Sequence, residues 1–333
     1  MNVRTTRAAR HRWAAVATVG AMAGTAGLFG AVPAVAAQTI AVHCPTDNLQ
    51  TAIDNAAPGS TLLISGTCVG NFIVNKNLNL TGGAVLDGNQ TDTTIRITNG
   101  VQASLTNLVI TNGNGLNGGG IANNGGSLTV TNCIVRNNNA TNNGGGINND
   151  QGGTLTLDRS TVRNNTAVNN AGGIITNSVA TVTGSTVSDN SAPSVGGIYN
   201  FGGTLTLSRT VVRTNHSAGI GGLYTYTGGT TTLSSSTVTG NTSTGDAGGL
   251  GNDGTLTLNS SSVSGNSAAH DGGGIYNGSG STTLNSTSVT HNTAGNDGGG
   301  IFKAGGTVTL NTSAVRDNVP NNCAPTPIPG CTG

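Results

Sequence analysis

The feature that most constrains the fold of this chain is a repeat of about 25 residues, written eight times between about residue 115 and the C-terminal region. Its clearest copy is Asp271-Gly-Gly-Gly-Ile-Tyr-Asn277, and its Gly-Gly-(Ile/Leu) part recurs at steps of 26, 27, 24, 25, 27, 25 and 26 residues. A unit of this length buries its apolar side only by stacking on its neighbours. We therefore expect a solenoid.

Three apolar positions keep the same phase in every repeat, and the runs around them have the length and the period of short strands. Three short strands per unit, joined by tight turns, predict an all-β fold: a single-stranded parallel β-helix of about ten or eleven coils. The general preference of parallel crossovers makes it right-handed. The three series are Ile121, Ile147, Ile174, Ile198, Leu223, Leu250, Ile275 and Ile301; Val130, Leu157, Val182, Leu207, Leu233, Leu258, Leu284 and Leu310; and Val135, Val162, Val187, Val212, Val238, Val263, Val289 and Val315.

The N-terminal residues 1–37 have the pattern of a secretory signal peptide. A basic start with four arginines precedes a small apolar stretch at 14–32, and Ala34-Val-Ala36 fits a signal-peptidase site. We expect cleavage after Ala36 or Ala37, and export of a bacterial protein to the cell surface or the medium.

The mature chain is predicted to have three parts: an N-terminal cap at 38–60, the β-helix at 61–319 and a Pro- and Cys-containing tail at 320–333. The cap contains the one predicted helix, with Asp47 as its N-cap, and this helix is expected to cover the open end of the core. Its predicted apolar face consists of Leu49, Ala52, Ile53 and Ala56.

Five cysteines remain in the mature chain, which for an exported protein predicts two disulfides and one free thiol. Proximity in the sequence favours Cys44 with Cys68 and Cys323 with Cys331, one bond at each end of the domain. Cys133 occupies a phase that holds Ser or Thr in other repeats, so we interpret it as a small packed residue.

Two columns of asparagines are interpreted as structural, because stacked amides can hydrogen-bond between strands about 4.8 Å apart. Asparagine also tolerates the left-handed backbone of a sharp corner. One column is Asn138, Asn165, Asn190, Asn215, Asn241, Asn266, Asn292 and Asn318; the other is Asn123, Asn149, Asn200, Asn252 and Asn277.

The repeat Gly-Gly-Gly-Ile-Tyr-Asn, followed by Thr-Leu-Thr-Leu and Ser-x-Val-x-x-Asn-x-Ala, resembles that of bacterial polymorphic outer membrane proteins. It also resembles the wider pectate-lyase-like β-helix superfamily. This resemblance covers roughly residues 45–320 and is specific for the fold. It leaves function open, because the architecture carries lyases, hydrolases and adhesins. The membrane-anchoring segment of the autotransporter members has no counterpart in this sequence, so we expect no membrane insertion.

Charge argues against a nucleic-acid partner. Without the leader, nine basic residues stand against 12 acidic ones, a net charge of about −3, whereas nucleic-acid binding calls for a basic patch. The oligomeric state is left open by the sequence.

Aromatic residues are the most informative candidate for a ligand site. Six of the seven in the mature chain lie one or three positions after the Ile/Leu marker, where alternation points side chains outward. The first four are predicted to form an exposed two-by-two patch suited to stacking on sugar rings, although stacked aromatics can also serve only to stabilise neighbouring strands. The six are Tyr199, Phe201, Tyr224, Tyr226, Tyr276 and Phe302.

A weaker candidate is a column of carboxylates four residues before the Ile/Leu marker, namely Asp246, Asp271 and Asp297. Three aspartates on successive coils repel one another, and a bound calcium ion would relieve the repulsion. The alternative is that Asp replaces Asn in a turn. No other cofactor is expected, and no catalytic residue is singled out.

Three functions follow in order of preference. The first is a secreted, non-catalytic protein that binds a polysaccharide or a cell-envelope glycan through its aromatic face. The second is a polysaccharide lyase or glycoside hydrolase, for which His270 beside Asp271 is the only pair of interest. The third is ice binding by the outward Thr-x-Thr pairs, such as Thr154 with Thr156, which resemble the flat faces of β-helical antifreeze proteins.

Overall fold

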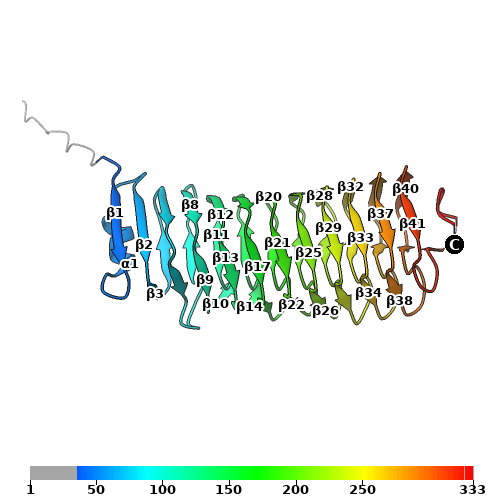
Figure 1. The fold of residues 1–333 in the computed structure, drawn as a ribbon, viewed down its shortest axis with the longest axis horizontal. Coiled ribbons are helices and arrows are strands. Elements are labelled where there is room, and N and C mark those ends of the chain that lie inside the picture. Colours follow the sequence, from blue (N-terminus) through cyan, green and yellow to red (C-terminus); the bar gives the residue numbers. More distant parts are fainter. Residues whose placement is uncertain (1–35, 326, 333) are drawn as a thin grey trace, which may run out of the picture. The chain divides into compact units, whose positions relative to one another are not determined.

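The computed structural model describes residues 36–325 and 327–332, so the predicted signal peptide lies outside the described residues except for its last two positions. The described chain forms a right-handed parallel β-helix of about eleven coils, which follow one another from β1 and α1 to β41 (Figure 1). None of the helices in this described part is long and apolar enough to cross a membrane. The predicted fold class is confirmed.

Strands of the same phase in successive coils pair in parallel and build four sheets. The first sheet contains β1 (Thr39–His43), β2 (Thr61–Ser65), β5 (Leu78–Thr81), β8 (Gln102–Thr106), β12 (Ser127–Thr131), β16 (Thr154–Asp158), β20 (Val179–Thr183), β24 (Thr204–Ser208), β28 (Thr230–Ser234), β32 (Thr255–Asn259), β36 (Ser281–Asn285) and β40 (Thr307–Asn311). The second contains β3 (Thr67–Val69), β6 (Val85–Asp87), β9 (Val109–Thr111), β13 (Ile134–Arg136), β17 (Thr161–Arg163), β21 (Thr186–Ser188), β25 (Val211–Arg213), β29 (Thr237–Thr239), β33 (Ser262–Ser264), β37 (Ser288–Thr290) and β41 (Ala314–Arg316).

The other two sheets lie on the remaining sides of each coil. The third contains β4 (Phe72–Val74), β7 (Ile95–Ile97), β11 (Ile121–Asn124), β15 (Ile147–Asp150), β19 (Ile174–Thr176), β23 (Ile198–Asn200), β27 (Leu223–Thr225), β31 (Leu250–Asn252), β35 (Ile275–Asn277), β39 (Ile301–Lys303) and β42 (Cys323–Ala324). The fourth contains β10 (Asn114–Asn117), β14 (Asn139–Asn143), β18 (Thr166–Ala167), β22 (Ser191–Ala192), β26 (His216–Ser217), β30 (Thr242–Ser243), β34 (Ser267–Ala268) and β38 (Thr293–Ala294).

The fourth sheet was not anticipated by the count of three strands per coil. Most of its strands have two residues, too few for an apolar period to appear in the sequence. Both predicted end segments also contribute strands: β1 of the cap pairs with β2, and β42 of the tail pairs with β39.

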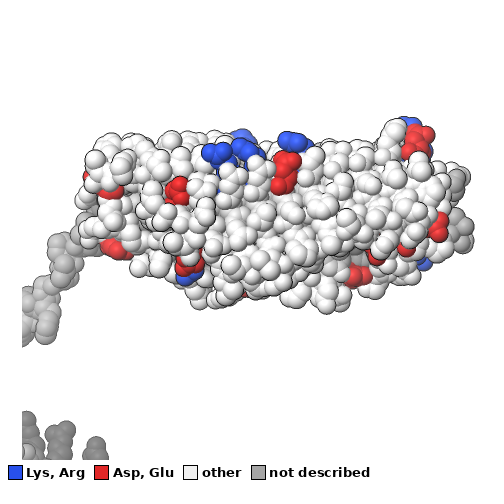
Figure 2. All heavy atoms as spheres, turned by 90° about the horizontal axis from the view of Figure 1, so that it is seen from below, with Lys and Arg blue, Asp and Glu red and all other residues white. Residues whose placement is uncertain are grey.

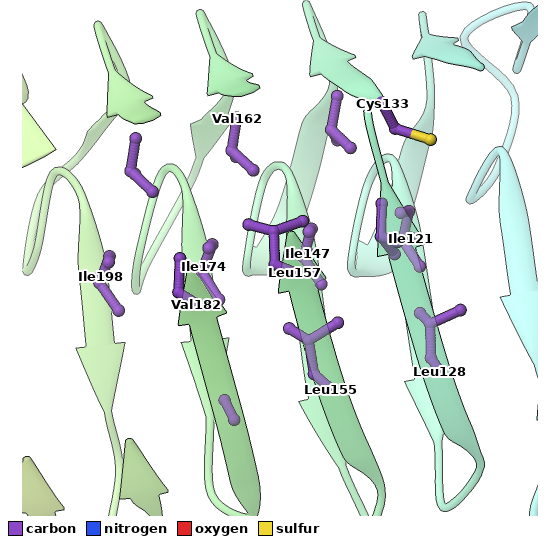
Figure 3. Close-up of a cluster of buried hydrophobic side chains, with 14 of the residues drawn as sticks. Ile121, Leu128, Cys133, Ile147, Leu155, Leu157, Val162, Ile174, Val182 and Ile198 are labelled. Atoms are coloured by element: carbon purple, nitrogen blue, oxygen red, sulfur yellow. The ribbon is translucent and has the colours of Figure 1, made fainter. Parts of the chain in front are cut away.

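The core is one continuous apolar cluster in which equivalent side chains stack from coil to coil. Ile121, Ile147, Ile174 and Ile198 follow one another in a single file, with leucines and valines of the neighbouring sheets facing them (Figure 3). Each of these isoleucines is fully buried. The predicted apolar series therefore face the inside of the coil.

A buried ladder of amides runs beside the core, as the first asparagine column predicts. The Oδ1 atom of each asparagine accepts bonds from both the backbone N–H and the Nδ2 group of the asparagine one coil earlier, at 2.9–3.0 Å from Asn165 to Asn318. The left-handed backbone expected of this column lies one residue earlier, at positions such as Asn137, Asn164 and Asp189. In these coils the residue with the left-handed backbone directly precedes the asparagine of the ladder.

The predicted helix is present as α1 (Leu49–Asn55), and Leu49, Ile53 and Ala56 are buried against the first coil. Its N-cap is Asn48, whose side chain accepts from the Thr51 N–H. The prediction of Asp47 as N-cap was wrong by one residue, because the Asp47 carboxylate instead accepts from the backbone N–H of His43, at 2.7 Å.

Both predicted disulfides are present: Cys44–Cys68 near the helix and Cys323–Cys331 in the tail. Cys133 is buried and free, and its thiol makes the contacts that serine hydroxyls make at this phase, with the Leu108 N–H and the Leu105 carbonyl. Burial raises the pKa of Cys133 to about 11, so it remains a thiol at neutral pH.

Truncating one amide in the middle of the ladder should be strongly destabilising. Asn215→Ala leaves the backbone N–H and Nδ2 of Asn190 without their acceptor and the Val187 carbonyl without its Nδ2 donor. Since an orphaned buried polar group costs about 1–3 kcal/mol, we expect a loss of about 3–5 kcal/mol in the free energy of unfolding, measured by urea denaturation.

The matched control is Asn169→Ala, because the exposed Asn169 amide donates only to the Asn142 side chain. We expect this variant to stay within about 0.5 kcal/mol of the parent. Equal losses in the two variants would contradict a structural role for the ladder.

Candidate functional site

The aromatic side chains lie on or beside the outer face of the third sheet, because the Ile/Leu marker of each strand points into the core. Tyr199, Tyr224, Tyr276 and Phe302 share one register, and Gly251 occupies the same register between the second and third. Phe201 and Tyr226 follow the ends of β23 and β27. The predicted grouping of the first four rings is therefore present.

Their exposure differs from the prediction. Tyr199 is only 6% exposed and belongs to a small apolar cluster outside the coil, with Ala171, Ile175 and Val195; Ile220 and Tyr224 are partly buried against it. Val195 and Ile220 stand where other coils carry Gly or Ala, and their larger side chains cover the rings. The predicted exposure of the two-by-two patch was therefore wrong for Tyr199, which is covered, and only partly right for Tyr224.

Two other rings remain open to solvent. Phe201 is 47% exposed and Tyr226 40% exposed, and they stack on each other with ring centroids 5.0 Å apart and planes 20° from parallel. Each also meets Tyr199 edge to face. This exposed pair extends the aromatic surface toward the first sheet.

A slot opens where Gly251 interrupts the column of large side chains. The cavity there has a volume of about 230 Å³ and is lined by Tyr224, Tyr276, Ile220 and the carboxylates Asp246 and Asp253, among others. A Cβ atom on Gly251 would lie 2.9 Å from Ile220 Cγ1 and 3.1 Å from Tyr224 Cδ2, so these two side chains lean over Gly251 and a side chain here would displace them.

The two rings of the slot face along the axis of the coil. Tyr224 stacks on Tyr199 with centroids 5.2 Å apart, and Tyr276 stacks on Phe302 at 5.4 Å. Each slot ring is thus backed by another ring on its far side. Because neighbouring strands are about 4.8 Å apart, Tyr224 and Tyr276 are attached about 9.6 Å from each other.

Hydrogen bonds hold the polar side chains of the slot. The Tyr224 hydroxyl donates to Asp253 Oδ2, while Asp253 Oδ1 accepts from the Ser279 N–H at 2.7 Å and from the Ser279 hydroxyl at 3.1 Å. Asp246 Oδ1 accepts from the Asp271 N–H at 3.2 Å and lies 3.9 Å from His270 Nδ1. Asp246 is therefore fixed by a donor from the following coil, and Asp253 by donors from both the preceding and the following coil.

Three tyrosines of this surface have a raised pKa. Burial, followed by the nearby Tyr226 and Asp253, raises the pKa of Tyr199 to about 12. Burial, the hydrogen bond to Asp253 and its charge raise the pKa of Tyr224 further. Burial and the charges of Asp246, Asp271 and Asp253 raise the pKa of Tyr276.

The predicted carboxylate column forms a hydrogen-bonded series instead of a cluster. Asp297 donates its backbone N–H to Asp271 Oδ1 at 3.0 Å, and Asp297 Oδ1 accepts from Asn321 Nδ2. Within the described ranges no three His, Cys, Asp or Glu side chains are grouped as metal ligands. These contacts account for the aspartates as turn residues, and calcium binding at Asp246, Asp271 and Asp297 stays a prediction.

His270 lies toward Asp246 of the preceding coil, so the pairing with Asp271 inferred from adjacency is not the contact that the structure contains. The threonine pairs of the first sheet, by contrast, stand in register as predicted, for example Thr204 with Thr230 and Thr206 with Thr232.

The sequence reasoning missed the slot itself, and with it Gly251, Asp253 and Ile220. The signal was present as a single glycine inside a column of tyrosines, next to two unusually large residues before the Gly-Gly motif. Whether this glycine leaves a cavity depends on which neighbouring side chains lean over it, and strand alternation does not specify their positions.

Comparison with known proteins finds similar folds only among solved structures. No protein-family model matches the chain, and no curated protein matches it. Among solved structures, pectate lyase Pel9A matches with a TM-score of 0.53 and 12% identity, over 86% of this chain and 82% of that chain. An alginate lyase from Paenibacillus sp. str. FPU-7 matches with a TM-score of 0.49 and 14% identity, over 83% of this chain and 99% of that one. The fold of this protein is that of the pectate-lyase-like parallel β-helix.

The raised pKa of Tyr199 has a consequence for alkaline stability. Because the folded-state value of about 12 exceeds the ordinary 10.0, ionisation favours the unfolded chain. The contribution of the protonated Tyr199 hydroxyl to the free energy of unfolding is complete below pH 10 and is lost as the pH rises from 10 toward 12. We expect Tyr199→Phe to lose less unfolding free energy than the parent over this interval, measured by urea denaturation at several pH values. If the unfolding free energies of the two proteins fell in parallel with pH, the raised pKa of Tyr199 would be contradicted.

Proposed function

We propose that this is a secreted, non-catalytic protein that binds a polysaccharide or a cell-envelope glycan through the aromatic surface of its third sheet. The observation that carries the proposal is the slot at Gly251, bounded by Tyr224 and Tyr276 and bordered by hydrogen-bonding carboxylates. The two disulfides accord with an oxidising destination outside the cell.

The dimensions of the slot suit one flat ring. A gap of about 9.6 Å between the attachment points of two stacking side chains accommodates one ring in contact with both, since carbon atoms in contact are about 3.5–4.0 Å apart. A volume of about 230 Å³ lies below the range of about 300–1,000 Å³ usual for drug-sized ligands. The slot therefore holds a single sugar unit, and the rest of a longer chain would lie outside it.

The chemistry of the slot suits a sugar. The tyrosine rings offer apolar faces to the C–H face of a pyranose, and the carboxylate oxygens accept hydrogen bonds from its hydroxyl groups. The exposed pair of Phe201 and Tyr226 supplies a second stacking surface three and two coils away from Tyr276, where another unit of a polymer would lie.

Filling the slot should abolish binding while the coil is retained, with the Ile220 side chain shifting away from the 2.9 Å contact that a Cβ at position 251 would make. Gly251→Tyr places in this coil the residue that neighbouring coils carry at the same register. We expect retention on insoluble polysaccharides, and binding of soluble oligosaccharides by calorimetry, to fall at least about tenfold, with an unchanged circular dichroism spectrum.

The control is Thr232→Ala, on the outer side of the first sheet. It should bind like the parent. Unchanged binding by Gly251→Tyr, or no binding of any glycan by the parent, would contradict the proposal.

The competing function, a lyase or hydrolase, is distinguished by the products. We expect oligosaccharides incubated with the protein, with and without calcium, to be recovered intact by mass spectrometry. New reducing ends or unsaturated products that disappear in Asp271→Ala would favour the enzyme and refute a non-catalytic role.

A further inference from the structure

The charge around the slot at Gly251 restricts which sugar it can take. Asp246 and Asp253 line it, and Asp271 adjoins it through the hydrogen bond between its N–H and Asp246 Oδ1. Oδ1 of Asp246 has this partner, whereas Asp246 Oδ2 accepts no hydrogen bond from any described residue. This oxygen is therefore available to a ligand.

Basic groups do not neutralise these carboxylates. In the described part of the chain, no Lys or Arg nitrogen lies within 4.0 Å of Asp246, Asp253 or Asp271, and the closest basic contact is His270, which is 3.9 Å from Asp246. On the face shown in Figure 2 most of the surface carries no charge. The slot thus lies in a locally negative field.

The raised pKa of Tyr276 agrees with this field. After burial, the largest influences on Tyr276 are the negative charges of Asp246, Asp271 and Asp253, which raise its pKa. All three carboxylates are therefore close enough to the Tyr276 hydroxyl to influence it electrostatically.

We propose that the slot selects a sugar ring that carries a protonated amino group, as in glucosamine polymers, and discriminates against uronate polymers. This inference rests on the proposed glycan-binding function and specifies its ligand. A ring between Tyr224 and Tyr276 brings its substituents next to Asp246 and Asp253, where an ammonium group gains an ion pair and attraction to the tyrosine faces. A carboxylate at the same place meets two like charges, which specifically disfavours it.

The test compares three oligosaccharides of equal length: glucosamine, N-acetylglucosamine and galacturonate oligomers. Binding is measured by calorimetry at mildly acidic pH, where the amines are protonated, at low and at high salt. We expect the glucosamine oligomer to bind most tightly and the galacturonate oligomer most weakly. High salt should reduce the advantage of glucosamine over N-acetylglucosamine, because it screens partly exposed charges.

The decisive variant is Asp246→Asn, which retains an oxygen for the Asp271 N–H and removes the charge. The fold tolerates it, because Asn117, Asn143 and Asn170 occupy the same phase in earlier coils. We expect glucosamine binding to weaken about fivefold more than N-acetylglucosamine binding, because only the free amine loses a charge partner. Asp297→Asn is the matched control, since Asp297 is in the same column and does not line the slot.

The outcomes separate this inference from the proposed function. Equal affinity for the acetylated and free amines, tighter binding of galacturonate, or no effect of Asp246→Asn would overturn the amino-sugar assignment. If Gly251→Tyr still abolished binding in those cases, the slot would remain a glycan site. The absence of binding to all three oligomers would overturn the amino-sugar assignment, and the absence of binding to any insoluble polysaccharide as well would overturn both proposals.

Discussion

Pairing between equivalent positions of successive coils is the constraint on which the rest of this structure depends. Because every strand pairs in parallel with the strand one repeat away, each side chain lies directly above and below its counterparts. A buried position must therefore hold a residue that stacks on itself. Isoleucine does so by packing, and asparagine by donating from Nδ2 to the next Oδ1 while its own Oδ1 accepts from the previous coil. A buried amide is stable here only because its neighbours continue the series.

The same constraint explains where function can arise. Inward positions and corners have to repeat, so variation collects on the outer faces. On the third sheet the variation is local: tyrosines stand in the register that holds Ala122, Asn148 and Ile175 in earlier coils, Val195 and Ile220 replace Gly or Ala, and Gly251 removes one side chain from the column. The result is an external apolar cluster that ends in a slot. Tyr199 stabilises this arrangement, and Tyr276 presents its ring to the slot.

In this architecture a similar fold does not imply a similar binding site. The coil is similar to that of a pectate lyase, but a backbone of this kind supports many activities. What discriminates between ligands is the local combination of stacking rings and charges. In this protein the rings bound a narrow slot and the charges beside it are negative, with Asp253 anchored by the Tyr224 hydroxyl and the Ser279 N–H. The proposed ligand follows from that combination and not from the coil.

The sequence by itself determined the parallel β-helix, its core series, both disulfides, the capping helix and the asparagine ladder, since each follows from a period or from the distance between two cysteines. Only the tertiary structure decided that Tyr199 is buried and that Asn48, not Asp47, is the N-cap of the helix. It also decided that the Tyr224 hydroxyl donates to Asp253, 29 residues later in the chain. The physical reason is that periodicity specifies which residues stack, whereas exposure and side-chain contacts depend on how neighbouring turns fold over the sheet. The slot depends on both, because it exists where one glycine breaks the period and the side chains of adjacent coils shape the gap.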